Sequence, residues 1–253
     1  SSSLRSSETA VVTTLLSIAL VVAVFFFPGT SFSCFFLAVS PQEEIKNSSI
    51  LAKKETRIRN MDFEDFCQQV VKIKNLPLPG EDAHYKMEPE IRRNWREKVQ
   101  NQELKPKKAA VMALFYPKAD TTKFLLILRN TYQGVHSNQI GFPGGKVEPE
   151  DLNLLHTALR ETEEEVGVPR NAVTVIKDLS EVYIPPSNFL VQPYLGLYKQ
   201  PEPFVIQEEE VEALVEIPLL DFLDSRNEIE QQMKTSYSNN ITVPAFKLGG
   251  YTV

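Results

Sequence analysis

The segment that most restricts the fold is a glycine- and proline-rich loop at 141–145, followed by a long helix expected over 151–166. Gly167 suits the left-handed conformation in which many helices end, and it marks the helix terminus. Apolar side chains at helical spacing should form the buried stripe of this helix; they are Leu152, Leu155, Leu159 and Val166. Apolar runs typical of strands lie on both sides, which indicates an α+β fold with a mixed sheet rather than a regular βαβ array.

The remaining elements follow from the same periodicity rules. Strands are expected at 109–116, 124–128, 173–176, 182–184, 190–198 and 211–216. Apolar residues at helical spacing predict a helix over 62–73, and charged residues a second helix over 88–102. A short helix is expected at 218–223. The main sheet is therefore preceded by a short helical segment.

Composition excludes several classes of function. Of 253 residues, 42% are apolar and 24% charged, as in globular proteins. The net charge of -6 argues against general nucleic-acid binding, which usually needs a basic face. Cys34 and Cys67 have no metal-ligand spacing, and the three histidines are too scattered for a zinc signature.

The N-terminal region contains an almost uncharged apolar run at 10–27, long enough to span a bilayer as a helix. Three interpretations compete: a membrane anchor, a secretory signal, and sequence translated upstream of the true start. A signal fits poorly, because the run is long and the segment before it is barely basic. We favour upstream translation and a cytoplasmic protein, since Met61 opens a segment typical of a cytosolic N-terminus. If the anchor is genuine, basic residues after the run place the main domain on the cytoplasmic side.

These features divide the chain into a hydrophobic extension at 1–60, a helical segment at 61–105 and a main domain at 106–253. The stretch 245–248 has strand character, and nothing is expected to follow and cover it before Val253. We therefore expect the main domain to be truncated at its C-terminus.

The acidic end of the long helix predicts a cation site. Glu161, Glu164 and Glu165 share one helix face, where like charges cost roughly 0.2–0.5 kcal/mol per pair. Carboxylates at a helix C-terminus lose about another 0.3–1 kcal/mol each against the helix dipole. The alternative is a solvated acidic surface, but carboxylates placed so poorly for stability favour a bound cation. Oxygen ligands of this kind suit Mg²⁺ or Mn²⁺.

The loop before the helix can provide the other half of such a site. Gly144 and Gly145 lack a Cβ atom, which lets the backbone approach an ion or a phosphate closely. Lys146 adds a positive charge near the same point. A glycine pair alone usually marks only a tight turn, but its place before an acidic helix favours a binding site.

Loop and helix together resemble the box of the Nudix hydrolase family, a glycine followed by a helix ending Arg-Glu-aliphatic-any-Glu-Glu-any-Gly-aliphatic. The residues that match in order are Arg160, Glu161, Glu164, Glu165, Gly167 and Val168. Thr162 replaces an aliphatic residue, and Gly145 lies one residue further from Arg160 than in the common form. The resemblance covers about 108–222 and implies the α/β/α sandwich of this family.

The longer spacing resembles the coenzyme A pyrophosphatase branch of the family. There, Phe-Pro-Gly-Gly-Lys precedes two acidic residues three apart and Thr-Ala-Leu-Arg-Glu; here these are 142–146, Glu148, Asp151 and 157–161. Its upstream motif, Leu-Leu-Thr-any-Arg with a later histidine, is matched by Leu125, Leu126, Arg129 and His136. Ile127, Gly134 and Asn138 depart from the pattern.

The resemblance implies metal-assisted attack of water on the diphosphate linkage of a nucleoside diphosphate derivative. It assigns the Mg²⁺ or Mn²⁺ ligands to Gly144, Glu161, Glu164 and Glu165. The implied catalytic residues are Glu161, Glu164, Arg160, which orients the glutamates, and Glu210, a carboxylate outside the box. The implied substrate-binding residues are Arg129, His136 and Lys146.

Coenzyme A is the substrate that the branch implies, with 3′,5′-ADP and 4′-phosphopantetheine as products. A diphosphatase for ADP-ribose or NADH is the alternative within the family. A Nudix-fold binding module without catalysis is the alternative from another class, although such modules typically lose the box glutamates. A homodimer is left open, and a membrane is expected as a partner only if 10–27 is an anchor.

Overall fold

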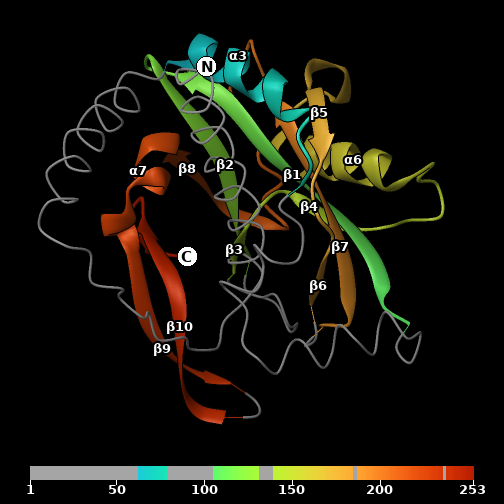
Figure 1. The fold of residues 1–253 in the computed structure, drawn as a ribbon. Helices are drawn as coiled ribbons and strands as arrows, with labels where there is room; N and C mark the ends of the chain where they lie inside the picture. Colours follow the sequence, from blue (N-terminus) through green and yellow to red (C-terminus); the bar gives the residue numbers. More distant parts are fainter. Residues whose placement is uncertain (1–61, 79–104, 131–138, 185–186, 236–237) are drawn as a thin grey trace, which may run out of the picture.

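The structure is a computed structural model that describes residues 62–78, 105–130, 139–184, 187–235 and 238–253 (Figure 1). The apolar run at 10–27, the helix expected at 88–102 and His136 lie outside the described residues. No helix within these ranges is long and apolar enough to cross a membrane.

Helices and strands alternate irregularly along the described chain. The helices are α3 (Phe63–Ile73), α6 (Leu154–Val166) and α7 (Leu219–Leu223), with 3₁₀ turns η1 (Arg170–Ala172) and η3 (Ser225–Asn227). The strands are β1 (Lys107–Lys118), β2 (Thr121–Arg129), β3 (Ile140–Gly141), β4 (Gly144–Lys146), β5 (Thr174–Asp178), β6 (Val182–Ile184), β7 (Phe189–Leu197), β8 (Val211–Pro218), β9 (Glu228–Thr235), β10 (Ser238–Leu248) and β11 (Tyr251–Thr252). The expected strands and the helices at 62–73 and 218–223 are confirmed, with shifts of a few residues at their ends.

The main sheet is mixed, as expected. Its strands run in the order β3-β2-β1-β7-β5, with β4 also pairing β1, β6 pairing β7 and β8 pairing β2. β1 and β7 are parallel, from Lys107 opposite Phe189 to Phe115 opposite Leu197. β1 and β2 are antiparallel and connected by a tight turn, in which Ala119 and Asp120 have positive φ.

Helices cover both faces of this sheet. Because the side chains of a strand alternate between its faces, each central strand contributes to a core on either side. Val111, Ala113 and Phe115 of β1 join one core, which also receives side chains from α3 and α7. Met112 and Leu114 join a second core, which receives side chains from α6. The order helix, sheet, helix confirms the predicted α/β/α sandwich (Figure 1).

The C-terminal strands form a second, three-stranded sheet in the order β11-β10-β9. A turn at Gly249 and Gly250 brings β11 back along β10, and Phe246 and Val253 exchange two backbone hydrogen bonds. The stretch at 245–248 thus has partners on both sides, and the expectation that nothing covers it is wrong. The division of the chain into three segments stays a prediction.

Candidate active site

The glycine-rich loop is fixed in place by the core on one side and by β1 on the other. Phe142 is buried, and its ring lies 6.1 Å from that of Phe124. The carbonyl of Pro143 accepts a hydrogen bond of 2.9 Å from Met112, and β4 then pairs antiparallel with β1. The loop therefore has little freedom to move, and its backbone groups have fixed directions.

Two glycines let this loop lie close to its neighbours, each in a different way. Gly144 has a φ of 148°, and a Cβ there would lie 2.3 Å from the carbonyl oxygen of Ala110. A Cβ on Gly145 would instead lie 2.4 Å from the carboxylate carbon of Glu161. Gly144 is thus required by its positive φ and by the close approach of β1, whereas Gly145 leaves space for the side chain of Glu161.

Helix α6 carries the acidic residues and begins later than expected, at Leu154 rather than at residue 151. Asn153 is the N-cap, since its side chain accepts a hydrogen bond from the His156 amide. Leu152 lies before the helix and is 85% exposed, so its assignment to the buried stripe is wrong. The predicted end is confirmed, because Gly167 takes the left-handed conformation with a φ of 71°.

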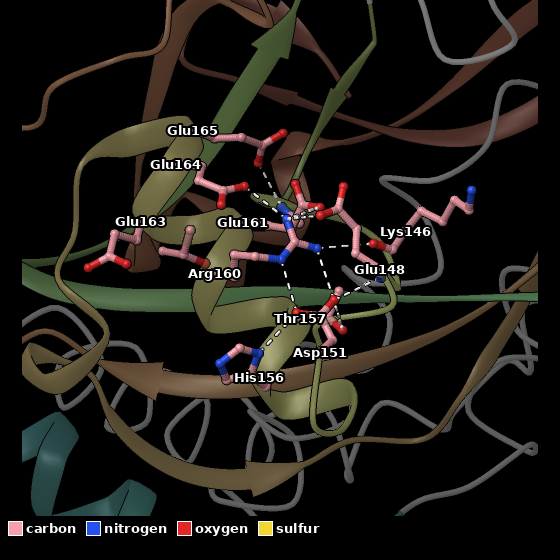
Figure 2. Close-up of polar contacts among 12 residues, drawn as sticks. Lys146, Glu148, Asp151, His156, Thr157, Arg160, Glu161, Glu163, Glu164 and Glu165 are labelled. Atoms are coloured by element: carbon pink, nitrogen blue, oxygen red, sulfur yellow. Dashed lines mark hydrogen bonds and ion pairs between the residues drawn. The ribbon is translucent and has the colours of Figure 1, made fainter.

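Asp151 lies before the first turn of α6, and its carboxylate binds the guanidinium of Arg160 (Figure 2). Its two carboxylate oxygens accept hydrogen bonds of 3.0 Å from Nε and Nη2 of Arg160. Further contacts come from the Glu148 amide, the Thr157 hydroxyl and His156 Nδ1. The Arg160 contact is the main reason that the pKa of the Asp151 carboxyl lies well below its usual range.

Arg160 links this buried carboxylate to the acidic face of α6. Its Nη1 lies 2.8 Å from Glu164 Oε2 and 3.0 Å from Glu161 Oε1. Its Nη2 also donates to the carbonyl of Lys146 at 3.2 Å. These contacts are those expected of a residue that orients the glutamates and ties them to the loop (Figure 2).

Asp151→Asn is expected to lower the free energy of unfolding by about 3 kcal/mol, because it removes the buried anion that pairs with Nε and Nη2 of Arg160. The closest anions left to the guanidinium are then Glu161 and Glu164, which it contacts through Nη1. The Asp151 side chain is 0% exposed, which allows no compensation by water. Urea unfolding measures the change. Glu148→Gln is the matched control: Glu148 lies 4.0 Å from Arg160 but is half exposed, and its loss should cost less than about 1 kcal/mol. Equal effects of the two substitutions would contradict the assignment.

Three glutamates meet beside the loop. Glu161, Glu165 and Glu210 each bring a carboxylate oxygen within 4.8 Å of the others. Glu165 is 0% exposed, and burial raises its pKa to about 7, although Arg129 and the Gly144 amide act in the opposite direction. Burial also raises the pKa of Glu161. Carboxylates crowded in this way with a backbone carbonyl nearby match the ligand set of a hard divalent cation.

Backbone contacts hold Glu210 in register with the helix. The amide of Gln207 donates to the carbonyl of Glu165 at 3.1 Å, next to the end of α6. Glu210 and Val211 both donate to the carbonyl of Gln207, at 3.1 and 2.9 Å, in a tight turn that leads into β8. The amide of Asn130, at the end of β2, donates to the Glu210 carbonyl. The helix end and the third carboxylate are thus joined by a short chain of hydrogen bonds.

The other acidic residues of the helix have different surroundings. Glu164 is 48% exposed and bonds Arg160, outside the group formed by Glu161, Glu165 and Glu210. Glu163 accepts a hydrogen bond of 2.6 Å from Nε of Arg170. The glutamates of α6 therefore have three kinds of partner: Glu161 and Glu165 lie in the carboxylate cluster, Glu164 bonds Arg160, and Glu163 bonds Arg170. The metal-ligand role of Glu164 stays a prediction.

A pocket of about 230 Å³ opens on the loop beside these carboxylates. Its polar border includes Arg129, Gly144, Gly145 and Lys146, and its apolar walls include Val111, Ile140, Ile184, Phe189 and Val191. The side chain of Lys146 extends away from the box glutamates (Figure 2). The pocket thus combines two cations with an apolar interior, next to an acidic cluster.

Arg129 belongs to both the pocket and the acidic cluster. Its Nη1 lies 2.9 Å from Glu165 Oε1, and its Nη2 donates to the Gly144 carbonyl. The spacing of 36 residues between Arg129 and Glu165 gave no sign of this contact. The sequence placed Arg129 only with the substrate, and the role of Asp151 as the partner of Arg160 was also missed.

The structure has the fold that the sequence predicted, with the glycine-rich loop beside the acidic helix. A family model described as NUDIX domain matches residues 106–237. The chain belongs to the Nudix family. The match covers every residue of the acidic cluster and of the loop before it.

Two relatives illustrate the similarity of this Nudix chain to known proteins. The uncharacterised Nudix hydrolase NudL of Yersinia enterocolitica is 44% identical over 99 residues, 39% of this chain and 50% of that protein. NudL of Yersinia pestis is 39% identical over 117 residues, 46% of this chain and 58% of that protein. The chain thus spans about half the length of the curated relatives that it matches.

Solved structures of Nudix proteins are similar to the chain at lower identity. A C. elegans Ap4A hydrolase has a TM-score of 0.39 and 22% identity, over 46% of this chain and 82% of that chain. The Nudix domain of Shewanella oneidensis NrtR, complexed with ADP ribose, has a TM-score of 0.38 and 20% identity, over 51% and 85%.

Proposed function

We propose that this Nudix chain hydrolyses the diphosphate linkage of a nucleoside diphosphate derivative, with Mg²⁺ or Mn²⁺ as cofactor. The observation that carries the proposal is the cluster of Glu161, Glu165 and Glu210, which Arg129 connects to a pocket that it lines together with Lys146. Carboxylates bind the metal, and the basic side chains bind the phosphates. A pocket of this size accepts part of a small substrate rather than a polymer.

The metal would be held by the carbonyl of Gly144 and by Glu161, Glu165 and Glu210, with Glu164 as a further predicted ligand. When bound, such an ion stabilises negative charge on the diphosphate and makes a water molecule easier to deprotonate. The donor set fits this group, because all its atoms are oxygens and three carboxylates lie close enough together to share one ion.

The side chains divide the remaining work among themselves. Arg129 and Lys146 line the pocket and are placed to bind phosphate oxygens. Glu210 is the exposed member of the three glutamates, and the carboxylate oxygen that it does not give to the metal is proposed as the general base that accepts the proton of the attacking water. Arg160 holds Glu161 and Glu164 in orientation. Water adds to one phosphorus, and the bond from that phosphorus to the bridging oxygen breaks.

Coenzyme A is the substrate that we propose, on the strength of the longer box and the motif at 142–146. The apolar walls formed by Ile184, Phe189 and Val191 suit an uncharged part of such a molecule. ADP-ribose or NADH is the alternative substrate class, and a binding module without catalysis is the alternative of another kind. Gly134 and Asn138, which depart from the branch pattern, are the reason to test substrates side by side.

The test is metal-dependent hydrolysis of coenzyme A, ADP-ribose, NADH and a diadenosine polyphosphate by the same protein. We expect release of 4′-phosphopantetheine from coenzyme A with Mg²⁺ or Mn²⁺, and its loss on addition of EDTA. A preference for ADP-ribose or NADH would keep the reaction and replace the substrate. Binding of these compounds without any turnover would favour the binding module instead.

A further inference from the structure

Arg129 bonds two of the groups that the proposed function assigns to the metal, the Glu165 carboxylate and the Gly144 carbonyl. Its guanidinium donates through Nη1 to Glu165 Oε1 at 2.9 Å and through Nη2 to the carbonyl of Gly144. The other carboxylate oxygen of Glu165 accepts the Gly144 amide at 2.8 Å. Arg129, Glu165 and Gly144 therefore form a closed set of contacts at the edge of the pocket, with Arg129 as the cation.

A guanidinium and a divalent ion cannot both bind these two acceptors in the same geometry. An ion such as Mg²⁺ takes oxygen ligands at about 2.0–2.1 Å, closer than Nη1 of Arg129 lies to Glu165 Oε1 at 2.9 Å. Two positive groups a few ångströms apart in a largely buried site also repel each other strongly. Arg129 and the ion therefore compete for Glu165.

We propose that Arg129 and the divalent metal exclude each other at Gly144 and Glu165, and that metal binding releases the Arg129 guanidinium into the pocket. This inference rests on the metal site of the proposed function. Arg129 already lines the pocket in which the diphosphate is proposed to bind. Before metal binds, Arg129 neutralises the buried carboxylate of Glu165, which would otherwise lack a counter-charge.

The exclusion has a consequence for the order of binding. Metal loading would free a bidentate phosphate donor at the same moment that it adds a divalent charge, and both changes favour an anionic substrate. By the reciprocity of linked equilibria, a diphosphate that attracts Arg129 would also strengthen metal binding. Arg129 thereby links the affinity of the metal to that of the substrate.

The test measures Mn²⁺ affinity without substrate, by calorimetry of the full chain after removal of metal with EDTA. Arg129→Lys keeps the positive charge, but one ammonium group reaches the two acceptors less well than a planar guanidinium. We expect Arg129→Lys to bind Mn²⁺ about tenfold more tightly than the wild type. Lys146→Gln is the matched control, since Lys146 lines the same pocket without these contacts, and it should leave the affinity within about twofold.

A second variant separates exclusion from simple repulsion. Arg129→Gln removes the charge, so tighter binding in this variant alone, with Arg129→Lys unchanged, would mean a field effect and overturn the inference. Unchanged affinity in both variants would also overturn it. If the wild type binds no Mn²⁺ and Glu165→Gln alters nothing, the proposed metal site itself is wrong. Thermal unfolding of each variant verifies that it is folded.

Discussion

Glu165→Gln is expected to lower kcat/KM for metal-dependent hydrolysis by roughly 10³-fold, because several kcal/mol of stabilisation by the metal depend on its ligands. Glu165 is the fully buried member of the three glutamates, and its carboxylate contacts both the loop and Arg129. The amide of glutamine has nearly the same shape but no charge, which makes the substitution a test of charge rather than of packing. Steady-state kinetics at saturating Mn²⁺ measures the loss.

Glu163→Gln is the control for this prediction. Glu163 lies two residues earlier on the same helix and in the same acidic run, but it bonds Arg170. We expect its replacement to change kcat/KM by less than about threefold, since a partly exposed ion pair contributes little. Comparable losses in both variants would mean that the general negative charge of the helix matters, and not the ligand geometry.

Gly144→Ala is expected to lower the free energy of unfolding by about 3 kcal/mol or more, through backbone strain and overpacking together. At a φ of 148° an L-residue is strained, and the new Cβ would lie 2.3 Å from the carbonyl oxygen of Ala110 and 2.5 Å from Cα of Val111. Both neighbours are backbone atoms of a central strand, which cannot move aside cheaply. Urea or thermal unfolding of the purified variant measures the effect.

Gly145→Ala is the comparison that makes this prediction specific. The three atoms nearest to its Cβ would all belong to the carboxylate of Glu161, the far end of a flexible side chain. We expect a stability change below about 1 kcal/mol together with weaker Mn²⁺ binding, because Glu161 is pushed away from the other ligands. A large loss of stability here, or none in Gly144→Ala, would contradict the described geometry of the loop.

What the sequence predicted well were features with a local cause. The end of α6 was correct because Gly167 needs only its own conformation to stop a helix. Its start was predicted too early because the N-cap is Asn153, whose side chain accepts a hydrogen bond from the His156 amide, and not a residue before Asp151. The contact between Asp151 and Arg160, nine residues apart, was missed because the helical periodicity of apolar residues does not indicate it.

What the sequence did not contain were pairings between distant segments. The strands were predicted, but the parallel pairing of β1 with β7 depends on a crossover that periodicity cannot specify. The contact of Arg129 with Glu165 likewise depends on how β2 faces α6 across the loop. Glu210 was a weaker candidate than the box residues, because Glu208 and Glu209 beside it have the same chemistry and only the turn at Gln207 distinguishes them.

The turn between the helix and β8 also determines which changes this site can tolerate. A tight turn places Glu210 three residues after Gln207, and the amide of Gln207 is hydrogen-bonded to the end of α6. Exposed side chains at 208 and 209 can therefore change the local electric field without moving a ligand. An insertion or deletion there would instead break the register between the third carboxylate and the other two. Segment length is constrained at this point, whereas side-chain identity is free to adjust how strongly ions are attracted from solution.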